Sequence, residues 1–325
     1  MTGSRPAPRS PLSGWRLRGL LLSVGLSAVG YLGFSLWAGW AEVSTAFARI
    51  GMAGLGAALA LSLVNYGLRF LRWQHYLALL HDRVPPLFSL RVYLAGFALT
   101  TTPAKAGEAL RSVFLKGHGV AYRHSLAALL AERLSDLAAV VLLIIPGLWA
   151  YSSGQPLVAF IAAGLAGAVW VLQKPRWLRR LSAVLRRLLP RRLRGAVTSL
   201  IEVVIHTGRC FKPRTLLLSM TLGVLAWGAE GTALHLLTGM VGGEMDLATS
   251  LFIYGFAMLV GALSFIPGGL GGTEVTMVAL LVLNRVPEPQ AIAVTVMIRL
   301  ATLWFAVALG LLSVLSLRTQ AADAD

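Results

Sequence analysis

The chain reads Ser264-Phe265-Ile266-Pro267-Gly268-Gly269-Leu270-Gly271-Gly272-Thr273-Glu274 between an apolar run at 247–263 and another at 275–283. At the depth of a membrane interior, an open backbone turn is costly unless protein surrounds it or it lines a cavity. Proline removes a backbone donor and glycine lets the chain double back, while Thr273 can cap the helix that restarts at Glu274. The stretch therefore predicts a broken helix in a membrane protein. A simple kink or a surface loop is the alternative, since glycine and proline are frequent in transmembrane helices.

The composition also indicates a membrane protein. Apolar residues make up 57% of the 325 residues and charged residues only 13%, so several runs could not be buried in an ordinary soluble domain. The net charge of +16 collects in the links between apolar runs, which favours contacts with anionic lipid heads over nucleic acid. The single cysteine, Cys210, excludes an internal disulfide, and its basic surroundings predict a reducing cytoplasm around it.

Eight apolar runs predict the membrane topology. Six approach or exceed the roughly 20 residues that a membrane-crossing helix needs: 19–40, 51–68, 125–151, 156–172, 215–240 and 291–317. The shorter runs at 87–101 and 247–263 each end in a proline turn followed by a second short helix, which is typical of re-entrant hairpins. We therefore expect one polytopic all-α integral membrane domain over 1–325, with about six full transmembrane helices and two re-entrant helical hairpins.

The basic segments give the orientation through the positive-inside rule. If the basic N-terminus at 1–18 is cytoplasmic and 87–116 returns to its own side, every dense basic segment falls on one side. If 87–116 crossed once, the arginine-rich linker at 173–214 would lie outside. The sequence therefore predicts cytoplasmic N- and C-termini.

The linker at 173–214 has an amphipathic pattern. Apolar residues recur at helical spacing opposite arginines: Trp177, Leu178, Leu181, Leu185 and Leu188. This pattern is typical of a helix that lies in the interface of an anionic leaflet, and Pro190 is expected to start a second short helix reaching Val203. A loop whose charges only fix the topology is the alternative.

Two parts of the chain follow one pattern. Each has a span, a hairpin that turns at proline, a glutamate and then a span with an arginine; the separations are 133 − 108 = 25 and 299 − 274 = 25 positions. The expected turn residues are Pro103, Gly107, Pro267, Gly268, Gly269, Gly271, Gly272 and Thr273. With the topology above, 51–151 and 215–317 become inverted-topology repeats, which bring broken helices together near the midplane where many transporters bind substrate.

Charged side chains in or beside the apolar runs need partners or water, since an arginine or aspartate at a helix centre costs about 2.5–3.5 kcal/mol to insert. The candidate substrate-binding residues are Lys105, Glu108, Arg111, Arg133, Asp136, Glu230, Glu274 and Arg299. We expect Glu108 to pair with Arg133 and Glu274 with Arg299, while Glu230, Arg111 and Asp136 line a polar cavity. Helix N-termini and paired arginines there suit a phosphate headgroup. Structural ion pairs that only pin the hairpins are the alternative.

The remaining polar and aromatic residues are expected to have ordinary roles. Arg69 and Arg72 are predicted to snorkel at the cytoplasmic end of the second span. Tryptophans 37, 40 and 73 fit an interfacial belt. Since no histidine has a partner at metal-ligand spacing and no nucleotide or hydrolase motif occurs, we expect no metal and no cofactor.

With these residues in view, the chain resembles the transmembrane region of the lysylphosphatidylglycerol synthetase/flippase family. The matching pieces are residues 69–73, 103–111, 132–136, 267–274 and 299–300. The resemblance implies a flippase-like transporter that moves a phospholipid or a polyprenyl- or isoprenoid-linked lipid between leaflets of a prokaryotic inner membrane. It also implies membrane lipids with an anionic or phosphate-bearing headgroup, and lipid- or glycolipid-synthesis enzymes, as partners.

The resemblance also bears on catalysis. The aminoacyl-transfer domain that follows these spans in the full synthetases does not follow here before Asp325, so we expect a transporter and not an enzyme. Two alternatives stay open: a membrane-embedded enzyme acting on a lipid phosphate head, and a non-transporting partner of a lipid-synthesis enzyme.

Overall fold

The computed structural model describes residues 40–100, 108–148, 155–264 and 266–322. Within them the regular secondary structure is entirely helical, which confirms the expected all-α class. Four helices of this described part are long and apolar enough to cross a membrane, and they are Ser44–Leu79, Gln155–Leu172, Pro213–Met240 and Glu288–Leu317. The predicted first span at 19–40 lies outside the described residues, apart from its last position.

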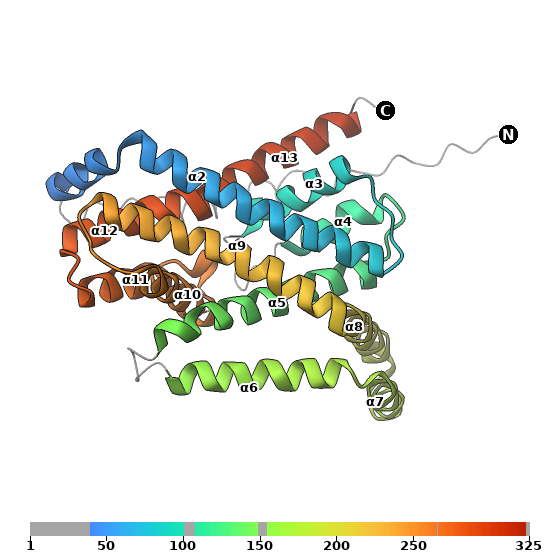
Figure 1. Ribbon diagram of the computed structural model, residues 1–325. Helices are drawn as coiled ribbons and strands as arrows, with labels where there is room; N and C mark the ends of the chain where they lie inside the picture. Colours follow the sequence, from blue (N-terminus) through green and yellow to red (C-terminus); the bar gives the residue numbers. More distant parts are fainter. Residues whose placement is uncertain (1–39, 101–107, 149–154, 265, 323–325) are drawn as a thin grey trace.

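The helices follow one another in two similar series joined by a third group (Figure 1). The first series is α2 (Trp40–Leu79), α3 (Pro86–Ala95) with the 3₁₀ turn η1 (Gly96–Leu99), α4 (Leu110–Lys116) and α5 (Tyr122–Leu148). The joining group is α6 (Gln155–Leu172), α7 (Pro175–Leu188) and α8 (Arg191–Arg209). The second series is α9 (Pro213–Met240), α10 (Leu247–Leu263), the 3₁₀ turn η4 (Pro267–Gly269), α11 (Gly272–Leu283), α12 (Glu288–Arg299), the π-helical turn η5 (Leu300–Trp304) and α13 (Phe305–Ala322).

The two series pack against each other in a matching way. The long helices α2 and α9 lie side by side and run in opposite directions (Figure 1). Helix α5 of the first series packs on α9 of the second, and the second series matches this with α12 packing on α2. In the same way, α10 of the second series packs on α5, and α3 of the first series packs on α13. The links agree as well, because a residue with positive φ follows each long first helix (His81, Gly242) and each short helix before the last span (Gly119, Arg285).

Each pair of short helices folds back on itself. Helices α3 and α4 are in contact, and the rings of Phe88 and His118, near their outer ends, stack with centroids 3.6 Å apart. Helices α10 and α11 are also in contact, and Val286 after α11 lies next to Gly243 before α10. The chain therefore enters and leaves each pair at the same end of the bundle.

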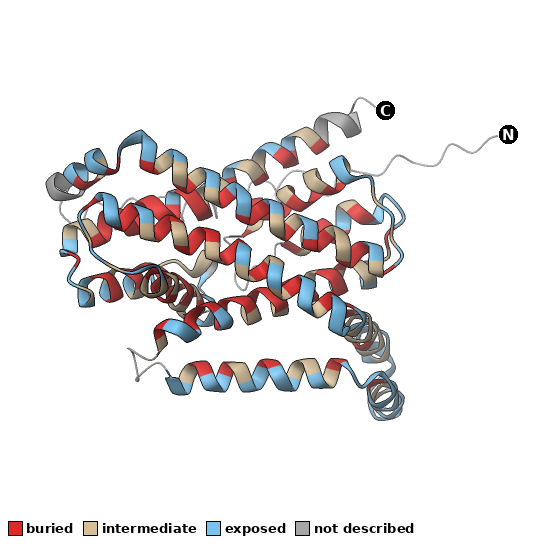
Figure 2. Ribbon diagram, viewed as in Figure 1, coloured by how far each residue is buried: buried red, intermediate tan, exposed pale blue. Residues whose placement is uncertain are grey.

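The basic helices gather at one end of the bundle. Helix α8 lies against the start of α5 and α7 packs on α8, at the end where α2 finishes and α13 ends (Figure 1). Leu178 of α7 is buried whereas Trp177 and Leu188 are exposed, and Figure 2 shows most of α7 exposed. The expected second helix after Pro190 is present, although it continues to Arg209 and does not stop at Val203. Three acidic residues mark the links at the opposite end: Glu244, Asp246 and Glu288.

Helix α11 begins differently from the expectation. The helix starts at Gly272, its N-cap is Gly271 with φ 82°, and the Oε2 of Glu274 accepts the Gly271 N–H at 2.7 Å. Thr273, expected to be the cap, is instead buried within the first turn, where Gly261 of α10 approaches it closely. The prediction of a Thr273 cap is therefore wrong, because the left-handed glycine directs its N–H to the glutamate carboxylate.

Candidate functional site

A network of arginines and carboxylates lies where α5 meets α2 and α4. Its centre is Glu132 of α5, which is completely buried. Its Oε1 accepts from Arg69 Nη2 at 3.1 Å and from the Tyr93 hydroxyl at 2.9 Å, and its Oε2 accepts from Arg111 Nη1 at 2.8 Å. Arg133 Nη2 lies 3.1 Å from Oε1. One carboxylate thus joins charged side chains from α2, α4 and α5.

Asp136, one helical turn further along α5, is the second carboxylate of the network. Its Oδ2 lies 3.1 Å from Arg69 Nη2 and 3.2 Å from Arg133 Nη2. Its Oδ1 accepts from Arg72 Nη2 and, at 3.1 Å, from the indole Nε1 of Trp227 on α9. Asp136 therefore ties α2 and α9 to α5.

Glu108, the third carboxylate, shows the expected pairing with Arg133, at 3.3 Å between Oε2 and Nη2. Its Oε2 lies equally far from Arg111 Nη2, and its Oε1 accepts from Thr100 Oγ1 at 3.3 Å. Arg111 was expected to line a polar cavity, but it is 1% exposed and its guanidinium lies 4.1 Å from the ring centroid of Tyr93. That expectation is wrong, because two carboxylates and an aromatic face fully enclose the guanidinium.

The network carries an excess of positive charge and opens at one residue. Four arginines face three carboxylates, which leaves a net charge of +1 among these described groups. The side chain of Arg133 is 25% exposed, whereas the other six are at most 8% exposed. Among these seven side chains, Arg133 is therefore the most exposed.

The second series has a smaller and sealed counterpart. Arg299 Nε donates to Glu274 Oε1 at 2.6 Å, as expected from the equal spacing, and Nη2 donates to the Gly268 carbonyl at 2.8 Å. The Arg299 side chain is only 2% exposed. Glu230 on α9 accepts from the Tyr254 hydroxyl at 2.5 Å. Here the arginine fixes the turn at η4 and is not presented to a cleft.

The two series differ in charge at matching positions. After the turns, corresponding residues are 166 positions apart, as the pair Glu108 and Glu274 shows (274 − 108) and the pair Arg133 and Arg299 repeats (299 − 133). Before the turns, corresponding residues are 161 positions apart, as Tyr93 and Tyr254 show (254 − 93). With these offsets, buried apolar residues replace Arg72, Arg111 and Glu132 of the first series: Ala233, Met277 and Ile298. The charged site is thus concentrated in the first series.

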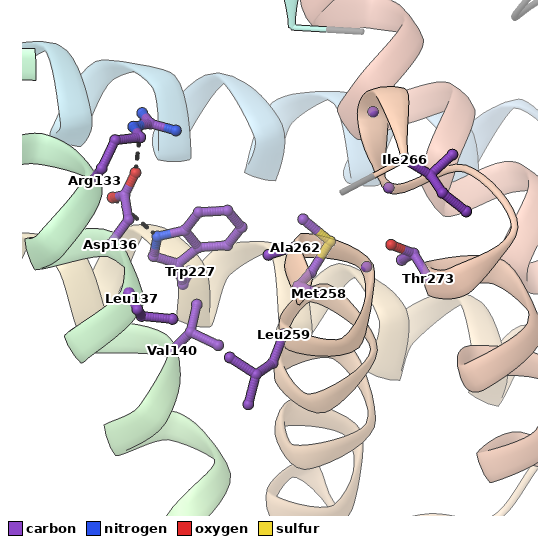
Figure 3. Close-up of a pocket in the computed structure, with 13 residues that line it drawn as sticks. Arg133, Asp136, Leu137, Val140, Trp227, Met258, Leu259, Ala262, Ile266 and Thr273 are labelled. Atoms are coloured by element: carbon purple, nitrogen blue, oxygen red, sulfur yellow. Dashed lines mark hydrogen bonds and ion pairs between the residues drawn. The ribbon is translucent and has the colours of Figure 1, made fainter. Parts of the chain in front are cut away.

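A cleft of about 470 Å³ opens on one side of Arg133 (Figure 3). Arg133, Asp136 and Trp227 form its polar end, and Thr273 and the backbone at Gly268 and Gly269 contribute from the turn. The remaining wall is largely apolar, with Leu137, Val140, Met258, Leu259 and Ile266. A cleft that is charged at one end and apolar along its walls suits an amphipathic molecule.

A groove of about 670 Å³ reaches Arg133 from the other side, between α5 and α8. Lys116, Tyr122 and Arg123 stand at its outer part, and its wall includes Leu126, Leu129, Leu130 and Leu200. The α5 residues of groove and cleft recur every three or four positions, so they share one face of the helix. Arg133 lies where the groove and the cleft meet along this face.

A third, small cavity of about 50 Å³ separates the two series near the turns. Its polar lining includes Tyr66, Arg69, Glu108, Glu230, Tyr254 and Arg299. The expectation that Glu230 lines a polar cavity is met here, and Asp136 lines the larger cleft. The cavity is too small for a lipid headgroup but large enough for ordered water.

Sequence reasoning missed four residues of the network environment: Arg69, Arg72, Glu132 and Trp73. Arg69 and Arg72 do not snorkel, since both are buried in the network, and Trp73 is 0% exposed beside Arg111 and not in an interfacial belt. The useful signal was the i, i+3 spacing of the two arginines, because α2 continues to Leu79 and places both on its inward face. Lys105, Pro103 and Gly107 lie outside the described residues.

The chain is similar to known proteins over most of its length. The family model described as the lysylphosphatidylglycerol synthase TM region matches residues 19–310. A UPF0104 membrane protein of Pyrococcus horikoshii is 23% identical over 92% of this chain and 97% of its own length. A UPF0104 membrane protein of Methanothermobacter thermautotrophicus is 36% identical over 89 residues, which are 27% of each chain.

Proposed function

Because the chain belongs to the family of the lysylphosphatidylglycerol synthase transmembrane region, we propose that it is a flippase-like transporter that moves a lipid with an anionic, phosphate-bearing head between leaflets. The lipid class covers phospholipids and polyprenyl- or isoprenoid-linked lipids. No chemical step on the lipid is part of the proposal. The membrane is the inner membrane of a prokaryotic cell.

The observation that supports this function is the position of Arg133. It is the partly exposed arginine of a network with a net charge of +1, and it lines both the groove and the cleft. A phosphate head can therefore approach one guanidinium from either side. The Nη2 of Arg133 faces the three carboxylates, and the exposed part of the side chain can offer a charge-assisted hydrogen bond to a phosphate oxygen.

The apolar walls account for the lipid tail. Leu126, Leu129 and Leu130 line the groove, and Leu137 and Val140 continue the same face of α5 into the cleft. A head that slides along this face keeps its charge near polar groups while the hydrocarbon tail remains against leucine and valine side chains or in the bilayer. Asp136, Glu132 and Glu108 hold Arg133 in place, so the positive charge stays inside the membrane without a ligand.

The proposal includes the membrane topology. We place α3–α4 and α10–α11 as re-entrant hairpins and count α5 as a full span, since its 27 residues extend about 40 Å. The basic end of the bundle, with α7 and α8, faces the cytoplasm by the positive-inside rule. Arg133 follows the start of α5 by 133 − 122 = 11 residues, or about 16 Å, which brings it close to the middle of the bilayer.

Translocation of fluorescent lipids in proteoliposomes tests the function. Purified protein would be reconstituted with acyl-labelled NBD-phosphatidylglycerol or an NBD-labelled polyprenyl phosphate, and the fraction bleached by external dithionite would be followed. We expect the wild-type protein to move at least one probe faster than protein-free vesicles do. Arg133→Gln should return that rate to the protein-free level, because the head loses its cationic partner.

The matched control is Arg192→Gln, which removes the same charge from the exposed surface of α8, outside the groove and cleft. It should retain the wild-type rate. Both variants qualify for the comparison if their far-UV circular dichroism spectra in detergent match that of the wild-type protein. If correctly folded Arg133→Gln moves the probe at the wild-type rate, Arg133 is not the headgroup site. If wild-type protein moves neither probe, the flippase function is wrong for these lipid classes.

A further inference from the structure

A second hollow lies at the basic end of the bundle, apart from Arg133. It has a volume of about 300 Å³ and is enclosed by α7, α8 and the start of α5. Its charged and polar lining consists of Arg123, Arg179, Arg209, Glu202, His206, Ser182 and Thr198. Arginines from three helices line it, so the tertiary packing, and not one amphipathic helix, creates the hollow.

The charges of the hollow are unbalanced. Arg123 Nη1 already faces Glu202 Oε2 at 3.6 Å. Among the described residues, no carboxylate lies within ion-pair distance of Arg179 or Arg209. His206 adds no charge at neutral pH, since burial and the nearby Arg209 lower its pKa below the ordinary value. Three arginines and one glutamate therefore leave a net charge of +2.

The hydrogen-bonding groups of the hollow are mostly donors. The two arginines without an acid partner offer guanidinium forks, and the hydroxyls of Ser182 and Thr198 line the same space. The Nδ1 of His206 is buried without a hydrogen-bond partner among the described residues. A tetrahedral oxyanion satisfies such a set of donors better than a neutral or cationic group does.

We propose that this hollow is a second anion site, which binds a phosphate monoester, the dianionic head of a lipid such as phosphatidic acid or free phosphate itself. A monoester carries a charge of roughly −1.5 to −2 at pH 7, which matches the +2 of the lining, whereas a phosphodiester carries only one negative charge. The inference does not depend on lipid translocation. It gives α7 and α8 a ligand-binding role in addition to their position at the membrane surface.

The neighbouring groove favours a lipid over free phosphate as the source. Arg123 and Glu202 line both the hollow and the groove, so this half-exposed ion pair borders both spaces. Leu126, Leu129 and Leu200 of the groove offer an apolar surface beside the phosphate position. A short acyl chain could lie there while its head occupies the hollow.

Calorimetric titration of the purified full chain in phosphatidylcholine nanodiscs tests the site. The probes are dihexanoyl phosphatidic acid, dihexanoyl phosphatidylglycerol and inorganic phosphate. We expect saturable binding of the phosphatidic acid and weaker binding of the phosphatidylglycerol. Arg179→Gln with Arg209→Gln should weaken phosphatidic acid binding about tenfold or more, because two charge-assisted forks are lost.

The control pair is Arg187→Gln with Arg192→Gln, which removes the same charge from the same two helices at exposed positions outside the hollow. It should change the affinity by no more than about twofold, since separated surface charges are largely screened. If inorganic phosphate displaces phosphatidic acid at a concentration equal to that of the lipid, free phosphate is the ligand. If a higher concentration of phosphate is needed, the lipid is the ligand. Equal losses in the two variant pairs, or equal affinity for phosphatidic acid and phosphatidylglycerol, would overturn the site.

Discussion

At the scale of single residues, Asp136 is the carboxylate that holds both arginines of α2. It faces Arg69, Arg72 and Arg133, and Arg72 is 0% exposed. A guanidinium enclosed in this way cannot regain water when its partner is removed. The carboxylate is therefore needed for the charged residues of α2 to remain inside the bundle.

We expect Asp136→Asn to destabilise the protein by about 3–5 kcal/mol, which is the usual cost of removing one partner from a buried ion pair. The amide keeps the shape of the side chain and one acceptor oxygen but leaves Arg69 and Arg72 without a full counter-charge. Unfolding followed by far-UV circular dichroism in detergent, with increasing denaturant, measures the change.

The control for this prediction is Glu202→Gln, which breaks the Arg123–Glu202 pair. Its side chains are 53% and 46% exposed and their closest charged atoms are 3.6 Å apart, so water can replace the lost partner. The change in stability should stay within about 1 kcal/mol. A loss for Asp136→Asn that is no larger than this would mean that the network does not hold α2 in place.

The sequence predicted part of this network. The equal separation of 25 positions identified Glu108 with Arg133 and Glu274 with Arg299, because a repeated architecture conserves spacing between its own elements. It did not identify Arg72 or Trp73 as interior residues. The apolar run appeared to end at residue 68, whereas α2 continues to Leu79 because carboxylates of α5 compensate its arginines.

At the scale of elements, the turn between α10 and α11 depends on close backbone approach. Gly268, Gly269 and Gly271 all have positive φ, which alanine adopts only with strain. Gly261 of α10 faces Thr273 and the Gly269 carbonyl so closely that a Cβ would not fit without movement. The glycines therefore permit both the reversal of the chain and the contact between the helices.

Alanine substitutions at two of these glycines separate backbone strain from steric conflict. Gly269→Ala and Gly271→Ala both place a side chain at positive φ, at a cost of about 1–2 kcal/mol. Only at Gly269 would the new Cβ meet other atoms, Thr273 Oγ1 at 2.8 Å and Gly261 Cα at 3.3 Å. We expect Gly269→Ala to lower the unfolding temperature more than Gly271→Ala does and to speed hydrogen exchange of the turn amides. Equal losses would show that strain alone matters there.

The existence of this turn could be predicted, but its details could not. Proline and clustered glycine in an apolar context identify a chain reversal from local chemistry. The identity of the N-cap depended on the φ of Gly271, and the π-helical turn at Leu300–Trp304 follows Arg299 within a largely apolar run that reads as one continuous helix. The cap has a local signature, Gly271 three positions before Glu274, whereas the local sequence shows no comparable signature for the π-helical turn.

At the scale of the whole molecule, one architecture is used twice with unequal chemistry. Each series supplies a long helix, a folded-back pair and a final long helix, whereas the inverted arrangement of the two series in a membrane stays a prediction. Buried apolar residues of the second series stand in place of Arg72, Arg111 and Glu132, and Arg299, the counterpart of Arg133, is sealed. The partly exposed arginine is therefore confined to one of the two series, since Arg133 is 25% exposed and Arg299 only 2%.

The native cysteine makes the topology measurable. Cys210 is 1% exposed, and burial raises the pKa of its thiol to about 12, so almost no reactive thiolate is present near pH 7. A membrane-impermeant maleimide should therefore leave the wild-type protein unlabelled. Any labelling of a variant then reports the introduced cysteine.

Single cysteines at Arg83, His118 and Glu244 distinguish a re-entrant α3–α4 pair from a crossing. Arg83 precedes α3, and His118 follows α4 beside Phe88, so both should be labelled from the side that also labels Arg187→Cys on α7. Glu244, in the link after α9, should be labelled only from the opposite side, since α9 runs the length of the bundle from the basic end (Figure 1). Labelling of His118→Cys from the side opposite to Arg83→Cys would mean that this segment crosses the membrane, and the opposed arrangement of the two series in the bilayer would then be wrong.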